Sequence, residues 1–176
     1  MTVDDLEMVL RWRNAPKVCK FMFDSAEIEQ ATHREWFALT SCNATRRLLI
    51  VEADEIPLGF VQFDSTDTGA VSHWGFYARP DAERGAGKAI GVSALDYAFD
   101  QLELHKVCGL VLDFNEASIR MHRYLGFQQE GFLREQHRAE GLYHSVVQFG
   151  LLHKEWRAAR SALMSKTRIK ANDQIH

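Results

Sequence analysis

Apolar residues recur at helical spacing near the start of the chain. Aliphatic positions three and four residues apart predict a helix over 3–14, and Thr2 with Asp5 has the spacing of a capping box at its start. Pro16 biases the residue before it away from helix, so this helix ends there. The next amphipathic stretch predicts a second helix over 27–39.

Beyond residue 45, short β-branched and aliphatic runs replace the helical pattern. Runs over 48–51 and 58–63 flank a four-residue turn region and predict a β-hairpin, and 70–78 predicts a third strand. An amphipathic helix is predicted over 87–102. The remaining elements are strands over 107–114, 127–133 and 142–152 and a short helix over 115–125, which Gly126 closes. This order predicts an α+β fold with a mixed sheet.

Length and charge limit the classes of protein that remain. The 176 residues carry a net charge of −3, which gives no general attraction for nucleic acid or for an anionic membrane. We therefore expect neither as a partner. We expect one domain over 1–158, followed by a basic tail over 159–176.

The cysteines and the N-terminus bear on metal binding and location. Cys19, Cys42 and Cys108 are odd in number and widely spaced, which predicts neither a zinc site nor a disulfide framework, and we expect no metal. The first residues are acidic rather than basic and apolar, and no apolar stretch approaches the ~20 residues that a membrane span needs. We expect a cytoplasmic protein.

A small-residue loop precedes the helix predicted at 87. The segment R-G-A-G-K-A over 84–89 lets the backbone curl tightly, and a helix N-terminus adds unpaired N–H donors and a partial positive charge. Arg84 and Lys88 add formal charge, so the loop suits a pyrophosphate. The spacing fits neither the Walker loop nor the Rossmann loop. A plain strand-to-helix turn is the alternative.

Two motifs resemble the GNAT N-acetyltransferase superfamily. Arg84, Gly87 and Ala89 fit its [QR]-x-x-G-x-[GA] loop for the acetyl-CoA pyrophosphate. The segment from Asn115 to Phe127 resembles its N-x-x-[AS]-I-x-L-[YH]-x-x-x-G-F segment. The resemblance implies a mostly antiparallel sheet flanked by helices, with one strand pair splayed apart to admit acetyl-CoA as co-substrate. It implies a cofactor site made of Phe76, Tyr77, Ala78, Arg79, Arg84, Gly85, Ala86, Gly87, Lys88, Ala89, Asn115 and Ser118.

The N-terminal third is similar to one branch of this superfamily, the nucleotide-sugar N-acetyltransferases of the pseudaminic acid pathway. The similar stretches are L-R-W-R-N over 10–14, the pair Phe21-Met22, and H-x-x-W-F over 33–37. That family acetylates the 4-amino group of a UDP-linked 4-amino-4,6-dideoxy sugar, a precursor for flagellin glycosylation. His122 stands where the motif usually has Tyr, as in the phosphinothricin-type amino acid acetyltransferases.

Two histidines are candidate catalytic residues. His122 lies two helical turns after Asn115, on the same helix face, and is the candidate general acid for the CoA thiolate. His73, on the strand beside the expected gap, is the candidate base for the amine, at a place where many GNAT enzymes carry Glu. The alternatives are packing roles for both rings, and Tyr124 competes with His122 as the acid.

The acceptor side rests on weaker patterns. Candidate substrate residues are Trp12, Arg13, Met22, His33 and Trp74. Arg suits a diphosphate, whereas the aromatic side chains and Met would cover a base or a deoxy-sugar methyl. Phosphinothricin-like amino acids and ribosomal-protein N-termini remain alternative acceptors, and a non-catalytic CoA-binding sensor is the alternative of another class.

Overall fold

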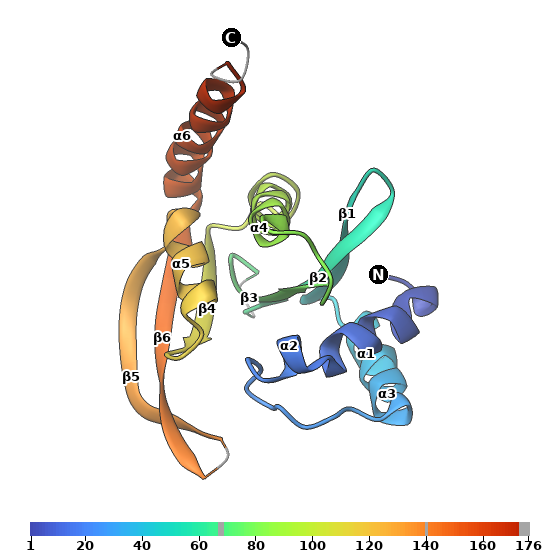
Figure 1. The fold of residues 1–176 in the computed structure, drawn as a ribbon. Helices are drawn as coiled ribbons and strands as arrows, with labels where there is room; N and C mark the ends of the chain where they lie inside the picture. Colours follow the sequence, from blue (N-terminus) through green and yellow to red (C-terminus); the bar gives the residue numbers. More distant parts are fainter. Residues whose placement is uncertain (67–68, 140, 173–176) are drawn as a thin grey trace.

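The computed structural model describes residues 1–66, 69–139 and 141–172 (Figure 1). A 3-10 turn, η1 (Val3–Asp5), opens the chain, and a π-helical turn, η2 (Tyr97–Gln101), extends α4. The helices are α1 (Leu6–Asn14), α2 (Pro16–Cys19), α3 (Gln30–Ser41), α4 (Ala86–Asp96), α5 (Glu116–Tyr124) and α6 (His153–Asn172). The strands are β1 (Arg46–Ala53), β2 (Ile56–Ser65), β3 (Val71–Ala78), β4 (Lys106–Leu112), β5 (Gln128–Ala139) and β6 (Leu142–Leu152).

The strands form one sheet in the order β1-β2-β3-β4-β6-β5. Every neighbouring pair is antiparallel except β3 and β4, which run parallel. Their pairing covers only Val71 to His73 against Lys106 to Cys108, and beyond it the strands diverge. Figure 1 shows the sheet dividing there into a β1–β3 half and a β4–β6–β5 half. The structure confirms the predicted α+β fold with a mixed, mostly antiparallel sheet and a splayed strand pair.

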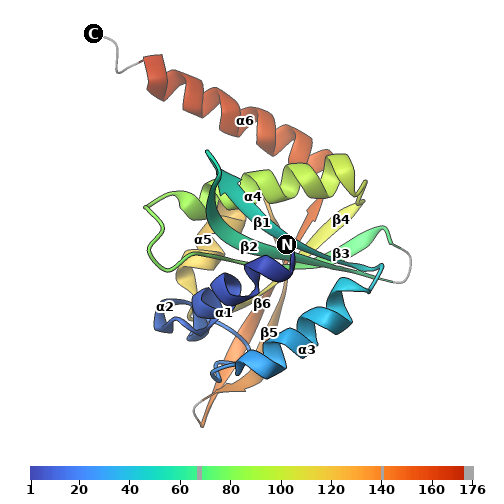
Figure 2. The same cartoon turned by 90° about the vertical axis from the view of Figure 1, so that its right-hand side faces the viewer.

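Helices cover both faces of the β1–β3 half, with α4 on one side and α1 to α3 on the other (Figures 1 and 2). The core lies between α4 and the sheet. Ile90 and Leu95 of α4 pack there with Val61, Phe63 and Phe149, and all five are at most 1% exposed. Burial of apolar side chains such as these is the main favourable contribution to folding. No helix in the described part of the chain is long and apolar enough to span a membrane.

Two local predictions near the N-terminal half need correction. Pro16 does not only end α1; it also begins the short helix α2, because its fixed φ and missing N–H are tolerated at the first helical position. The hairpin turn is tighter than predicted. Asp54 and Glu55, both with positive φ, make the whole turn, and Ile56 already pairs with Ala53.

The last hairpin is longer than the predicted strand over 127–133. β5 continues to Ala139, and its register slips between Leu133 and His137. Within this bulge Glu135 has a φ of 51° and its backbone N–H donates to the Ser145 hydroxyl at 3.2 Å. The bulge interrupts the apolar alternation that would have identified the rest of the strand.

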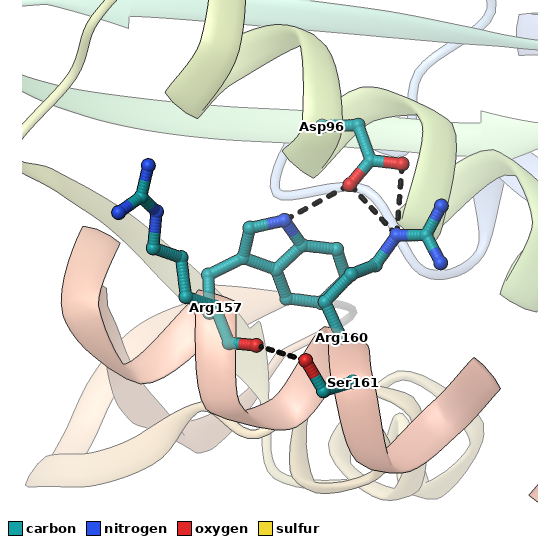
Figure 3. A network of polar contacts seen from close by, with 5 residues as sticks. Asp96, Arg157, Arg160 and Ser161 are labelled. Carbon is teal, nitrogen blue, oxygen red and sulfur yellow. Dashed lines mark hydrogen bonds and ion pairs between the residues drawn. The ribbon is translucent and has the colours of Figure 1, made fainter. Parts of the chain in front are cut away.

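The predicted boundary between domain and tail falls inside α6. The side chains of Trp156 and Arg160 both bond to Asp96 of α4 (Figure 3). Leu163 is 9% exposed. The first half of α6 therefore packs on the domain, whereas the helix as a whole projects beyond the sheet (Figure 2). Residues 173–176 of the predicted tail lie outside the described residues.

Candidate active site

Two connected cavities lie where β3 and β4 diverge. The outer cleft, about 680 Å³, runs between the end of β3, the loop before α4, and α5, with α2 on its open side. The inner cavity, about 310 Å³, lies between the diverging strands. Phe21, Met22, Phe76, Asn115 and Ser118 line both, so they mark the junction. A thioester reaching from the outer cleft would meet an acceptor in the inner cavity at this junction.

The loop before α4 has the geometry of an anion site. Gly85 is the N-cap of α4 with a φ of 110°, which a residue with a Cβ rarely adopts. Gly85, Gly87 and Lys88 line the outer cleft at the N-terminus of the helix, where backbone N–H groups and the helix dipole favour negative charge. Arg79 lines the same cleft. The predicted pyrophosphate loop therefore faces the cavity that would hold the cofactor.

The structure places most of the predicted cofactor residues around the outer cleft. The nine that line it are Phe76, Tyr77, Ala78, Arg79, Gly85, Gly87, Lys88, Asn115 and Ser118. The other three are not among the described residues that line the outer cleft. Arg84 is exposed in the loop, and Ala86 and Ala89 lie in the first turn of α4. Burial raises the pKa of Tyr77, and the nearby positive charge of Arg13 opposes this only in part.

The turn that begins α5 follows the expected cap. The Asn115 side chain accepts a hydrogen bond from the Ser118 backbone N–H at 3.2 Å, as an N-cap does. Gly126 ends the helix with a φ of 93°. Asn115 and Ser118 are thereby held at the junction of the two cavities.

His122 lines the inner cavity below this junction, and its side chain is only 2% exposed. Its Nε2 accepts a hydrogen bond from the Trp74 indole at 3.1 Å, and its Nδ1 lies 2.8 Å from the Ser118 carbonyl oxygen. Burial lowers the pKa of His122 to about 4, with the Ser118 contact opposing the shift, so the ring is neutral at pH 7. Its role as general acid stays a prediction, and the pairing of both ring nitrogens speaks against it.

His73 and Trp74 follow each other on β3 and both line the inner cavity. His73 is exposed and belongs to the last parallel pair, opposite Cys108. His73 therefore lines the cavity in which an acceptor amine would lie, and its role as the base stays a prediction. Trp74 is 7% exposed and forms part of the cavity wall.

The other predicted substrate residues do not gather at one place. Met22 lines both cavities. His33 is 5% exposed, stacks on Trp36 with ring centres 5.1 Å apart, and lines a different cavity between α1 and α3. Arg13 donates to the Asp24 carbonyl and so holds the segment between α1 and α3, and Trp12 is half-buried in α1. His33 therefore is not among the described residues that line the outer cleft or the inner cavity, and its predicted contact with the substrate stays a prediction.

Several residues at the site escaped sequence reasoning. Phe23 lines the inner cavity and Lys17 lines the outer cleft, and the sequence predicted neither. Phe21, which the sequence singled out only within a resemblance, lines both cavities. A side pocket of about 350 Å³ adjoins these cavities and contains Lys20, Ser25, Phe114 and His144. The segment that carries Lys17 to Phe23 is too short for a periodic signal. Among the described residues, no group of His, Cys, Asp and Glu side chains is arranged to hold a metal ion.

Comparison with known proteins agrees with this geometry. A family model described as the acetyltransferase (GNAT) domain matches residues 1–128. An uncharacterized N-acetyltransferase of Bacillus subtilis, the SPbeta prophage-derived YokL, is 30% identical over 125 residues, which are 70% of this chain and 71% of YokL. The acetyltransferase PseH of Campylobacter jejuni is 23% identical over 119 residues, 68% of this chain and 74% of PseH.

A solved structure shares the fold. The spermidine N-acetyltransferase from Vibrio cholerae, in complex with CoA and spermine, has a TM-score of 0.82 at 21% identity, over 89% of this chain and 94% of that one. The match of the family model over most of the chain, together with the splayed strands and the phosphate loop, shows that the chain belongs to the GNAT family of acetyl-CoA-dependent N-acetyltransferases.

Proposed function

We propose that this enzyme acetylates the amine of an anionic small molecule, and that a UDP-linked 4-amino-4,6-dideoxy sugar is the acceptor. The charge of the cavity walls carries the proposal. Lys20 lines the side pocket, and no Asp or Glu is among the described residues that line the side pocket or the inner cavity. Lys17, Arg79, Lys88 and Arg120 line the outer cleft, where they would face the cofactor. Walls of this sign attract phosphates and repel cations.

The same walls speak against a polyamine acceptor. A polycation is recognised by carboxylates, and the described cavity walls offer cations and aromatic rings instead. Phe21, Phe23 and Trp74 give the inner cavity an apolar surface that suits a 6-deoxy sugar. In the side pocket, Phe114 lies edge-on to His144 with ring centres 4.7 Å apart, and Lys20 stands nearby. The resemblance of the N-terminal third to the nucleotide-sugar N-acetyltransferases supports the same acceptor class.

The lining residues fit acetyl-CoA in the outer cleft. The loop at Gly85 to Lys88 would hold the pyrophosphate, and the edge of β3 over 75–78, which β4 does not pair, would bind the pantetheine arm. Acetyl-CoA supplies an acetyl group as a thioester. Backbone N–H groups on this edge would polarise the thioester carbonyl in the manner of an oxyanion hole.

The transfer is direct, in a ternary complex. The acceptor nitrogen attacks the carbonyl carbon, a C–N bond forms, and the C–S bond breaks with its electron pair going to sulfur. The amine loses one proton and the thiolate gains one. His73 at the inner cavity is the group that would accept the amine proton, directly or through water. Tyr124 lines the outer cleft, where the Lys88 ammonium lies 4.1 Å from its ring centre, and it stays the alternative proton donor for the thiolate.

The decisive experiment is an acceptor panel with acetyl-CoA. The panel contains the UDP-linked 4-amino-4,6-dideoxy sugar, the same sugar without UDP, spermidine, phosphinothricin and a ribosomal-protein N-terminal peptide. We expect the highest kcat/KM for the UDP-linked sugar and a large loss without UDP. A higher kcat/KM for spermidine or the peptide would contradict the proposal. A higher value for phosphinothricin would keep the anionic class and reject the sugar.

A further inference from the structure

A buried polar contact lies at the base of the fork between β3 and β4. The Trp74 indole N–H of β3 donates to Nε2 of His122 on α5 at 3.1 Å. Both side chains are almost fully buried. β4 passes beside them at Gly109, where an added Cβ would lie 2.6 Å from His122 Nε2 and 3.0 Å from Trp74 Nε1. Three elements therefore meet at one point, directly after the last parallel pair at His73.

The contact continues toward the cofactor side. Because Nε2 of His122 accepts from the indole, the neutral ring carries its proton on Nδ1, which donates to the Ser118 carbonyl at 2.8 Å. The Ser118 N–H in turn donates to the Asn115 side chain at 3.2 Å. Asn115 and Ser118 line both cavities. One chain of hydrogen bonds thus leads from the indole of β3 to the residues at the junction.

The surroundings of the ring fix it further. The His122 ring stacks on Phe149 of β6 with centres 4.9 Å apart and meets the edge of Phe127 at 4.9 Å. A ring held on its faces and at both nitrogens cannot swing toward a leaving thiolate without breaking buried hydrogen bonds. Removing either partner of the Trp74–His122 pair would leave the other's polar group buried and unpaired.

We propose that His122 is a positioning residue for acetyl-CoA transfer. Its hydrogen bond to Trp74 fixes the angle at which β3 leaves β4, and its bond to Ser118 holds the first turn of α5 against the cofactor. His122 does not supply the proton that the thiolate takes up. This inference rests on the acetyl-CoA-dependent function but not on the identity of the acceptor.

The test compares three substitutions by what each preserves. His122→Gln keeps an acceptor for the indole N–H and cannot act as an imidazole acid. His122→Leu removes the acceptor, and Trp74→Phe removes the donor while keeping a ring. Acetyl-CoA affinity is measured by calorimetry, which needs no acceptor, and the Trp74 indole N–H is followed by NMR. Thermal unfolding checks that each variant folds.

We expect His122→Gln to keep acetyl-CoA affinity within about threefold, and His122→Leu and Trp74→Phe each to weaken it about tenfold. The indole signal, assigned by its loss in Trp74→Phe, should stay hydrogen-bonded in His122→Gln and shift in His122→Leu. The double variant His122→Leu/Trp74→Phe should lose less than the sum of the two single losses. If His122→Leu does not fold, the comparison of His122→Gln with Trp74→Phe decides.

Two results would overturn the proposal. The first is that His122→Leu keeps both the wild-type acetyl-CoA affinity and the wild-type position of the Trp74 indole signal. Wild-type acetyl-CoA affinity in Trp74→Phe would count equally against the proposal. The second result concerns turnover, measured with any acceptor that the panel identifies. If His122→Gln binds acetyl-CoA normally but loses as much turnover as His122→Leu, then His122 acts as the general acid. Failure of the UDP-sugar proposal leaves the calorimetric and NMR results unaffected.

Discussion

The ammonium of Lys88 lies 4.1 Å from the centre of the Tyr124 ring, so the phosphate loop and the end of α5 meet at the outer cleft. A cation over an aromatic face is attracted to it, which restricts a side chain that would otherwise move freely in solvent. The contact holds a positive charge beside Gly85 and Gly87, where the cofactor phosphates are expected.

Replacing Lys88 should therefore weaken cofactor binding. We expect Lys88→Met to raise the acetyl-CoA Kd about tenfold through loss of a charge-assisted contact to phosphate. Calorimetry at low and high salt measures this, and the difference from wild type should shrink at high salt. Lys154→Met, on the exposed side of α6, is the control. Equal affinities for Lys88→Met and wild type at both salt concentrations would place the phosphates elsewhere.

The two loop glycines should respond differently to alanine. Gly85 has a φ of 110°, so Gly85→Ala should lower the free energy of unfolding by about 1 kcal/mol through backbone strain. Gly87 has ordinary helical backbone, and an added Cβ would meet only Met121 Sδ, at 3.4 Å. Gly87→Ala should keep its Tm and weaken acetyl-CoA binding about fivefold by crowding the cleft. An unchanged Tm in Gly85→Ala together with a lowered Tm and unchanged acetyl-CoA Kd in Gly87→Ala would contradict this account.

Burial of His122 predicts a loss of stability in acid. The unfolded chain takes up a proton near the reference pKa of about 6.5, whereas the folded protein, with the His122 pKa lowered to about 4, does not. Protons therefore favour the unfolded state as the pH falls from about 6.5 to about 4, and the free energy of unfolding should drop by about 3 kcal/mol. Urea unfolding between about pH 7 and about pH 4 measures this.

His122→Gln is the control for that pH series. Burial also lowers the pKa of His33, which contributes in the same direction in both proteins. The variant should therefore lose stability in acid, but less than wild type. Identical losses would show that His122 is not the source.

The anchor of α6 should matter for stability and not for the cofactor. Asp96 accepts from the Trp156 indole at 3.1 Å and from Arg160 Nε at 2.9 Å (Figure 3). Asp96→Ala should lower the free energy of unfolding by about 1–2 kcal/mol because it removes the acceptor that Trp156 and Arg160 share. Arg157→Ala is the matched control, since its backbone carbonyl and not its guanidinium bonds to Ser161. A loss of acetyl-CoA affinity in Asp96→Ala would contradict a purely structural role.

Lys20 should distinguish acceptor binding from cofactor binding. Lys20 lines the side pocket, whereas Lys17, one helical turn earlier, lines the outer cleft. We expect Lys20→Gln to lower kcat/KM for the UDP-linked sugar about tenfold, mainly through KM, with the acetyl-CoA Kd unchanged. Lys17→Gln should change the acetyl-CoA Kd instead. Equal effects of both substitutions on both ligands would reject this division of the site.

The sequence predicted correctly those helices whose capping residues lie next to them in the chain. Asn115 and Gly126 mark the two ends of α5, and the structure places both as predicted, since cap geometry depends on a few neighbouring residues. α2 has only four residues and no period to detect. The bulge at Glu135 depends on the Ser145 hydroxyl across the hairpin, a contact that no local pattern contains.

At the site, too, the sequence predicts contiguous motifs but not contacts between distant segments. The loop over 84–89 is contiguous in sequence, so its chemistry could be recognised directly. The environment of His122 is assembled from Trp74, Phe127 and Phe149, which come together only in the folded sheet. A helical period shows that His122 shares a face with Asn115, but it does not show whether that position is open to the cleft or closed by aromatic rings.

The segment between α1 and α3 supplies walls to all three cavities at the fork through Phe21 and Met22, yet it contributes no strand to the sheet. Its length and sequence can therefore drift without disturbing strand register or the phosphate loop. Substitutions at Lys20, Phe23 and Ser25, which line the acceptor-side cavities and not the outer cleft, would therefore change acceptor choice while leaving the acetyl donor site as it is.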